Sequence, residues 1–519
     1  MRSTFMGLET NKRGLYTQQS ALYTTGHNIS NANTDGYSRQ RVNMQPTGGY
    51  PGVGMNSGAM PGFLGTGVEA GSIQRIRDSF VDHQFRQEAN KLGYWESQSR
   101  AISQMEDVLN EPSHYGLQKS LSQFWQSLED LAVYPENEGA RKVAIQSGVA
   151  LTDSFHYIDK TLKEIQGNIN QEIKNLTLQT DENGKEQQGH INSILKQVAD
   201  LNDQISKVEP NGYMPNDLYD ARDVLLDELS MLIPIEVAYE KSGGRALDIA
   251  EGTVKVKLKN NGGSVTLVEK GNHGTIGANF TGNGTNPPLT GLNIKPAGGG
   301  DVEHVSHDNL LDTGRLKSLI NSYGVTGTNG PKGTYPDMIA ELNQMAKEFA
   351  EKFNDIHKKG TDLKGNQGTD FFGSNGQPEI TAENISVSKE ILNDASRFAA
   401  SDSDFNNPQE GNGKNAQALA DLQFDGLNGL GGSTIQSFYQ ALIGQLGEDG
   451  KRAERMMVNT GTLLGAVEHR RASISSVSLD EEMTDMIKFQ QAYNASARMI
   501  TVIDETLDKI INGMGVAGR

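Results

Sequence analysis

Apolar residues repeat at every seventh position near both ends of the chain, and this pattern limits the possible folds more than any other feature. Near the start, the repeat comprises Leu8, Leu15, Leu22 and Ile29. Near the end, it comprises Leu479, Met486, Tyr493, Ile500 and Leu507. Such a repeat forms a narrow apolar seam on a helix, which is typical of helices that pack on other helices in coiled coils. We therefore expect the two terminal segments to pair with each other or with neighbouring subunits.

A capping motif marks the predicted start of the second terminal helix. Ser478 is followed three residues later by Glu481, a spacing in which the Ser hydroxyl accepts a hydrogen bond from the Glu amide while the Glu carboxylate reaches back to the Ser amide. Two further acids in the first turn favour the positive end of the helix dipole. The predicted cap residues are therefore Ser478 and Glu481.

Between the ends, the pattern predicts a helical shell interrupted by a β-rich insert. Apolar residues three and four positions apart predict helices over residues 151–176, 191–208, 216–232, 336–360 and 435–446. The stretches "IEVAY", "TVKVKL" and "SVTLV" alternate apolar with polar residues between Gly-rich and Asn-rich turns, which indicates hairpins. The expected fold class is mainly α with a β-rich insert, in which a long helical-bundle shell joins a coiled coil to a small β domain.

The order of these segments predicts a nested, elongated, multidomain layout in which the chain runs outward and then returns. We expect a terminal coiled-coil domain from residues 1–45 and 476–519. A helical rod-like domain follows from residues 46–233 and 308–475, and a projecting β-rich domain from residues 234–307.

Composition excludes several classes of function. The 519 residues carry a formal charge of −18, whereas binding to nucleic acid or to an anionic membrane surface depends on clustered Lys and Arg. No segment approaches the roughly 20 apolar residues that a membrane-spanning helix needs. The chain has no cysteine, which excludes disulfides and thiolate sites and suits a protein that lives outside the cell without a folding oxidase. We expect no nucleic-acid partner and no membrane insertion.

Two patterns resemble metal sites only superficially. His304 and His307 have the spacing H-x-x-H, but they lie in a Gly-rich loop and lack the helical H-E-x-x-H pattern. The segment 362–370 resembles a calcium loop, yet Lys364 occupies a ligand position and Gln367 replaces the turn glycine. We expect solvated loop histidines and a hairpin turn. Because no nucleophile is paired with a base in a recognisable context either, we expect no enzyme and no cofactor.

A polar stretch, "NISNANTDGYSRQRV", directly follows the first predicted helix. Asn and Gly tolerate left-handed backbone, so this stretch is expected to end the inner helix at Ile29 and to begin the path outward at Tyr37. Together with the C-terminal "SLDEEMTDMIKFQQAYNASARMITVIDETLDKIINGM", it resembles the ends of the flagellar rod, hook and hook-associated family of axial proteins. The motif positions in the turn are Asn31, Asn33, Asp35, Gly36 and Tyr37.

Within that family, the middle of the chain resembles the hook-associated members found at the junction of hook and filament. The stretches that carry this likeness are "DLYDARDVLLDELS", "YPDMIAELNQMAKEFAEKFNDIHKKG", "DLKGNQGTDFF" and "SISSVSLDEE". Another axial protein of the hook or rod type is the nearer alternative, although the long helical middle argues against it. A ligand-binding or enzymatic insert on an exported filament protein is the more distant one, and no catalytic constellation supports it.

The resemblance implies a structural role outside the cell, in the bacterial flagellum. The chain would polymerise with itself as a short ring or helical layer, its terminal helices would pair as an inner coiled coil around a narrow channel, and variable domains would project outward. The implied partners are hook protein, a second junction protein on the filament side, and a dedicated export chaperone on the C-terminal helix. The resemblance also implies passage through the flagellar type III export apparatus without a cleaved signal peptide.

Overall fold

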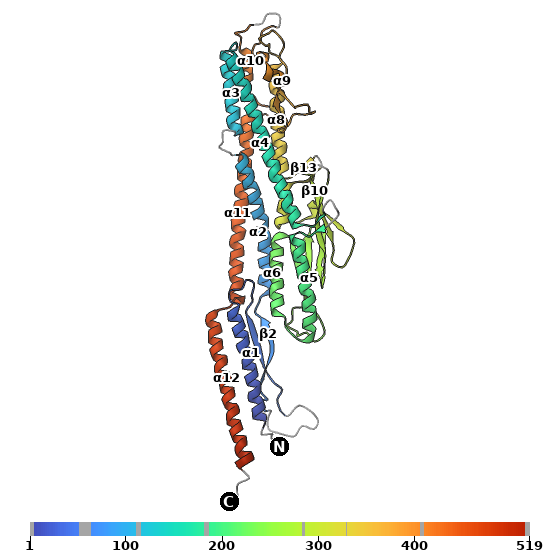
Figure 1. Ribbon diagram of the computed structural model, residues 1–519, viewed down its shortest axis with the longest axis vertical. Coiled ribbons are helices and arrows are strands. Elements are labelled where there is room, and N and C mark those ends of the chain that lie inside the picture. Colours follow the sequence, from blue (N-terminus) through green and yellow to red (C-terminus); the bar gives the residue numbers. More distant parts are fainter. Residues whose placement is uncertain are drawn as a thin grey trace.

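The computed structural model describes residues 5–50, 64–109, 116–180, 186–282, 286–327, 330–404 and 409–513. The molecule is elongated, and both ends of the described chain lie at the same tip (Figure 1). A pair of helices occupies that tip, a shaft of helices leads away from it, and β-sheets project from one side of the shaft. This arrangement confirms a mainly α fold with a β-rich insert and a chain that runs outward and returns, whereas the coiled coil of the terminal helices stays a prediction.

The tip, which we call the terminal unit, contains two helices and one hairpin. Helix α1 spans Met6–Ser30 and helix α12 spans Leu479–Asp508. The antiparallel strands β1 (Gln40–Pro46) and β2 (Val68–Arg75) run beside α1. The Thr17 hydroxyl of α1 donates to the Val68 carbonyl of β2 at 3.1 Å. Sequence patterning did not predict the hairpin, because neither strand shows a strict alternation of buried and exposed residues.

The shaft is built around α2 (Ser79–Leu109), which lies against α11 (Ile435–Ser475) along much of its length. Helices α6 (Asn216–Leu232) and α7 (Arg315–Tyr323) pack on α2 as well. Helix α11 extends well past the predicted residues 435–446. Glycine allows close packing along α11, since a Cβ at Gly450 would lie 3.3 Å from the Ile102 side chain of α2.

The far end of the shell holds an aromatic core. Five phenylalanines from α3, α8 and the segment 371–372 that leads into β14 are at most 1% exposed, and neighbouring rings lie with centroids 4.8–6.3 Å apart. They are Phe124, Phe349, Phe353, Phe371 and Phe372. The elements here are α3 (Leu117–Val133), α4 (Glu138–Leu176), α8 (Thr334–His357), β14 (Phe372–Gly373), β15 (Ser386–Val387), α9 (Lys389–Asn393) and α10 (Lys414–Asp421).

The β-rich insert forms two sheets beside α5 (His190–Val208). One has the order β5-β6-β7-β8; the other has the order β11-β10-β12-β13, with β9 also paired to β10. The first sheet contains β5 (Ile235–Glu240), β6 (Thr253–Asn260), β7 (Gly263–Glu269) and β8 (Asn272–His273). The second contains β9 (Thr275–Phe280), β10 (Leu289–Lys295), β11 (Glu303–Ser306), β12 (Val325–Gly327) and β13 (Gly330–Lys332). Two short strands, β3 (Gln179–Thr180) and β4 (Glu186–Gln187), precede α5.

The elements and the predicted domain boundaries differ at two places. The hairpin ends at Arg75 and packs on α1, whereas the predicted terminal domain stops at residue 45. The insert's second sheet continues to Lys332, past the predicted limit of residue 307. Strand β12 follows α7 in the sequence and returns to pair with β10. Residues 1–4 and 514–519 of the predicted terminal domain lie outside the described residues.

Candidate assembly interface

Helices α1 and α12 run antiparallel and approach each other closely along one line. A Cβ at Gly7 would lie 3.3 Å from Ile503 Cδ1, and a Cβ at Gly14 would lie 3.3 Å from Ser496 Oγ. Farther along, the Asn28 side chain bonds to Glu482. The α1 residues on this line recur every seven positions, as predicted for a helix-pairing seam, but they are small or polar. The helices can approach closely because glycine adds no side chain between them.

The predicted seam leucines lie one position further along α1 and flank this line. Leu8, Leu15, Leu22 and Ile29 are all only partly buried. On α12, Met486, Tyr493 and Ile500 are also partly buried, Leu507 is 9% exposed and Leu479 is 49% exposed. The structure therefore brings the two predicted seams to the same helix pair and leaves most of their side chains incompletely covered.

Other apolar side chains of α12 point into solvent. Met483, Ile487 and Val502 are 57%, 58% and 50% exposed. Among the described residues of α1 and α12, Ala21 and Leu507 are the only buried apolar side chains. A single copy of the chain thus leaves a large part of the apolar surface of its terminal helices in contact with water.

The turn after α1 is shaped by Gly36 and tied to α6. Gly36 has φ of 76°, and a Cβ there would lie 2.1 Å from Val224 Cγ2, so this position excludes any side chain. Asn31 ends α1, and its side-chain amide donates to the His27 carbonyl at 3.0 Å. The other predicted motif residues, Asn33 and Asp35, are exposed.

Asn28, which the sequence patterns did not single out, lies at the centre of the turn. It is 1% exposed, and both atoms of its side-chain amide are fully used. Its Oδ1 accepts from the Tyr37 hydroxyl at 2.8 Å and from the Gln40 amide at 3.0 Å. Its Nδ2 donates to the Gln40 carbonyl and to the Glu482 carboxylate, each at 2.9 Å. Burial, followed by the nearby Asp217, Asp220 and Glu482, raises the pKa of Tyr37, which keeps this hydroxyl as a donor.

The first turn of α12 differs from the predicted capping box, because Arg39 binds its carboxylates. Ser478 occupies the cap position, but among the described residues its side chain makes no capping hydrogen bond. The Glu481 carboxylate instead accepts from Arg39 Nη1, and the buried Glu482 accepts from Arg39 Nε at 2.7 Å. An arginine that reaches the first turn of a helix competes with the capping box, because a charge-assisted bond is stronger than a neutral one. Sequence reasoning missed both Arg39 and Glu482.

A buried group of ion pairs joins the hairpin base to the shell. Arg75 lies 2.7 Å from Asp220 and 3.0 Å from Asp223, both on α6. Arg77 contacts Asp223 at 3.2 Å, and Arg86 of α2 contacts the same carboxylate at 3.1 Å. Burial alone would raise the pKa of Asp223, but the guanidinium groups around it hold that pKa far below its usual range. Since a buried ion group tolerates the loss of any one member poorly, this contact is a fixed attachment.

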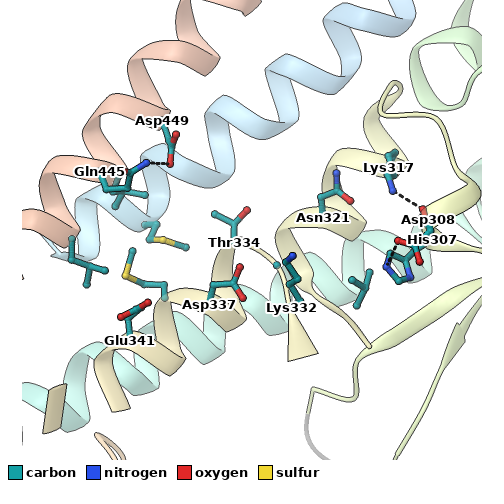
Figure 2. Close-up of a pocket in the computed structure, with 16 residues that line it drawn as sticks. His307, Asp308, Lys317, Asn321, Lys332, Thr334, Asp337, Glu341, Gln445 and Asp449 are labelled. Atoms are coloured by element: carbon teal, nitrogen blue, oxygen red, sulfur yellow. Dashed lines mark hydrogen bonds and ion pairs between the residues drawn. The ribbon is translucent and has the colours of Figure 1, made fainter. Parts of the chain in front are cut away.

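A cavity of about 600 Å³ lies where α11 and α8 meet the insert (Figure 2). Carboxylates from Asp337, Glu341 and Asp449 line it together with Lys332. Burial lowers the pKa of Lys317, and its ammonium donates to the His307 carbonyl at 2.7 Å, so it is engaged within the fold. Asp337 and Glu341 lie on α8, and Asp449 lies on α11.

The two histidines do not lie in the predicted loop: His304 is an exposed residue of strand β11, and His307, directly after that strand, is partly buried. His304 Nδ1 lies 3.0 Å from the Asn293 side chain, and the Asp362 carboxylate accepts from the Lys364 and Asn366 amides at 2.8 and 2.7 Å, which closes the predicted turn. Across the part of the chain that the structure describes, no three His, Cys, Asp or Glu side chains gather in a way that would hold a metal ion. Within the same residues, no helix combines the length and the apolar character needed to cross a membrane.

Three family models match the chain. The flagellar hook-associated protein FlgK helical domain matches residues 102–372. The flagellar basal body rod FlgEFG protein C-terminal model matches residues 471–513, and the flagella basal body rod protein model matches residues 8–37. The two shorter matches fall on α12 and on α1 with its turn, and the long match falls on the shell and the insert.

Relatives and one solved structure agree with these models. Flagellar hook-associated protein 1 of Bacillus subtilis (strain 168) is 41% identical over 530 residues, with 100% of both chains covered. The protein of the same name from Salmonella typhimurium is 25% identical over 96% of this chain and 98% of its own. The structure of the flagellar hook junction protein FlgK from Burkholderia pseudomallei has a TM-score of 0.58 and 14% identity, covering 77% of this chain and 100% of that one.

Proposed function

The chain belongs to the flagellar hook-associated protein 1 family, and we propose that it is a structural subunit that joins hook to filament by polymerising through its terminal helices. The copies form a short ring or helical layer. In that layer, α1 and α12 of each copy form the inner coiled coil, while the shell and the insert lie outside it.

The observation that carries this proposal is the incomplete burial of the terminal helices. Packed helices in a stable domain normally remove their apolar stripe from water, which contributes about 25 cal/mol for each Å² of apolar surface buried. Here Met483, Ile487 and Val502 of α12 are each at least 50% exposed, although α12 is paired with α1. Neighbouring copies that cover these side chains would supply the burial that one copy lacks.

The proposal extends to the partners that the family resemblance implies. Hook protein contacts one side of the layer and a second junction protein contacts the filament side. Before assembly, an export chaperone covers α12, because its exposed apolar side chains would otherwise promote early association. The layer lies outside the cell, and the subunits reach it through the flagellar type III export apparatus. The contacts described above use side chains for packing and ion pairing, so we infer a role without catalysis.

A charge placed in either seam tests this proposal. Leu22→Asp and Ile500→Asp each put a carboxylate where apolar contact is required, and burying an unpaired charge is strongly unfavourable. We expect both variants to lose filament attachment and swimming, while circular dichroism shows an unchanged shell. Gln19→Asp adds the same charge at an exposed position of α1 and should attach filaments normally. Normal swimming by the Leu22 and Ile500 variants would overturn the proposal.

A further inference from the structure

The terminal unit is attached to the shell in two unequal ways. On its N-terminal side, the turn and the hairpin are bonded directly to α6: the Ser38 amide donates to Asp220 at 3.2 Å, Gln40 Nε2 donates to Asp217 at 3.0 Å, and Asn216 Nδ2 donates to the Ile73 carbonyl at 2.9 Å. The buried Arg75 pairs add to this attachment. On its C-terminal side, α12 follows α11 after a short break at residues 476–478.

Helix α12 is held to the rest of the terminal unit at its first turn by one buried carboxylate. The Glu482 side chain is 2% exposed. One of its oxygens accepts from Asn28 Nδ2 at 2.9 Å, and the other accepts from Arg39 Nε at 2.7 Å. Glu481 and Asp485 also face Arg39, but their side chains are 62% and 37% exposed, so water screens those pairs and they contribute little.

The receiving site for this carboxylate is built without α12. Three of the four hydrogen bonds of the Asn28 amide run to Tyr37 in the following turn and to Gln40, the first residue of β1. The Arg39 carbonyl accepts from the Ile76 amide at 2.8 Å, which fixes its backbone to the end of the hairpin. The Arg39 amide donates to the Ser475 carbonyl at 2.8 Å, which also holds the last residue of α11. The Asn28 amide and the backbone of Arg39 are therefore held without α12, whereas the Arg39 guanidinium pairs with three acids of α12.

We propose that Glu482 is the positioning residue that docks α12 onto this prebuilt site, and that α12 is consequently a detachable arm of the terminal unit while α1, its turn and the hairpin stay on the shell. The inference goes beyond the proposed function, since it concerns the single copy and holds whether or not neighbouring copies complete the seam. It predicts that one carboxylate controls the opening of α12, while α6, the hairpin and residues 17–30 of α1 keep their places.

Both carboxylate oxygens of Glu482 must act as acceptors, because each of them faces a donor. In Glu482→Gln the amide keeps one acceptor and gains a donor, so in either orientation a donor faces the donor of Asn28 or that of Arg39. The neighbouring Glu481 provides a matched control, because Glu481→Gln removes the same charge next to the same arginine at an exposed position. A difference between the two variants therefore reports on the buried hydrogen bonds and not on charge.

Hydrogen exchange on the soluble full-length chain tests the inference. We expect Glu482→Gln to raise the exchange rates of α12 amides about tenfold or more, with unchanged rates in α6, the hairpin and residues 17–30 of α1, and we expect Glu481→Gln to match wild type. Arg39→Lys, which keeps the charge but removes the Nε donor, should also speed exchange in α12 alone. Equal effects of the Glu481 and Glu482 variants, no effect of Glu482→Gln, or equal acceleration in α1 and α12 would each overturn it.

The exchange experiment does not measure filament attachment, so a result that overturns the docking role of Glu482 leaves the proposed function unaffected. Conversely, normal swimming by the Leu22 and Ile500 variants would overturn the proposed function without deciding whether Glu482 docks α12 in the single chain. Hydrogen exchange decides that question.

Discussion

The far end of the shell and the terminal unit bury different kinds of side chain. In the shell, Phe124 packs among four other phenylalanines and Trp125, all nearly inaccessible to water. In the terminal unit, the buried side chains are largely polar, such as Thr17, Asn28 and Glu482, while leucines and methionines remain partly or largely exposed. Both regions are helical, yet only one of them has a hydrophobic core of its own.

This difference explains how one chain combines stability with assembly. A region with a complete core folds in isolation, because burial of its apolar surface offsets the loss of conformational entropy. A region held by hydrogen bonds and ion pairs keeps its geometry but gains little free energy from burial, so it stays available for contact with neighbouring copies. The shell thus fixes the position of the terminal unit, and in the proposed function the terminal unit provides the surface for polymerisation.

The largest effect is expected in the aromatic core. Phe124→Ala removes a ring that contacts five others and leaves a cavity, which should lower the free energy of unfolding of the shell by about 3–5 kcal/mol. Urea unfolding followed by circular dichroism measures this loss. Phe424→Ala, at a position that is 74% exposed, should change the free energy of unfolding by less than about 0.5 kcal/mol. Equal losses in the two variants would contradict a self-contained core.

A pH dependence is expected next, and it belongs to the shell. His357 is fully buried: its Nδ1 donates to the Thr369 carbonyl and its Nε2 accepts from the Ala399 amide. Burial lowers the pKa of His357 to about 4. Between pH 6.5 and 4 the unfolded chain therefore binds a proton that the folded chain does not, so the free energy of unfolding should fall as the pH falls, by up to about 3 kcal/mol. Below pH 4 this contribution should decrease no further.

Urea titrations at several pH values measure this slope. His357→Gln should flatten it between pH 6.5 and 4, whereas His83→Gln, at an exposed position of α2, should leave it unchanged. If His357→Gln kept the wild-type slope, another group would be responsible for the pH dependence of the shell.

The smallest effect on a single copy is expected on the outer face of α12. Ile487→Ser removes an apolar side chain that is 58% exposed, so the free energy of unfolding of the soluble chain should change by less than about 0.5 kcal/mol. The same variant should weaken polymerisation, measured by sedimentation of assembled layers. Leu507→Ser, at a buried position of the same helix, should instead destabilise the pairing of α12 with α1. An Ile487 variant that assembles like wild type would place this face outside the interface.

The sequence alone predicted the features that depend on local periodicity. The seven-residue repeats placed helices at both ends, and the three-and-four spacing placed α5 and α6 within a residue or two of their bounds. The strands β5, β6 and β7 were predicted from alternation. The glycine of the motif turn was predicted from the backbone freedom that such a turn needs, and Gly36 does adopt positive φ.

Features that depend on contacts between distant segments were not predictable in this way. Asn28 and Glu482 are separated by 454 positions and meet only because the chain returns to its starting point. The ion pairs of Arg75 with α6 arise from a hairpin whose strands lack a clear pattern. Polar residues in a helix are usually solvated, so their burial becomes visible only once the partner segment is in place. Asn28 directly precedes the predicted seam residue Ile29, so the seven-residue apolar repeat gave no signal for it.

The central claim is that the terminal helices of one copy are incompletely buried and that neighbouring copies complete their burial. Comparing amide hydrogen exchange in the dilute soluble chain with exchange in the assembled layer tests it most directly. The account predicts much weaker protection in α12 than in α2 and α11 for the soluble chain, and strong protection of α12 after assembly. Protection of α12 in the dilute chain as strong as that of α2, with no gain on assembly, would contradict it.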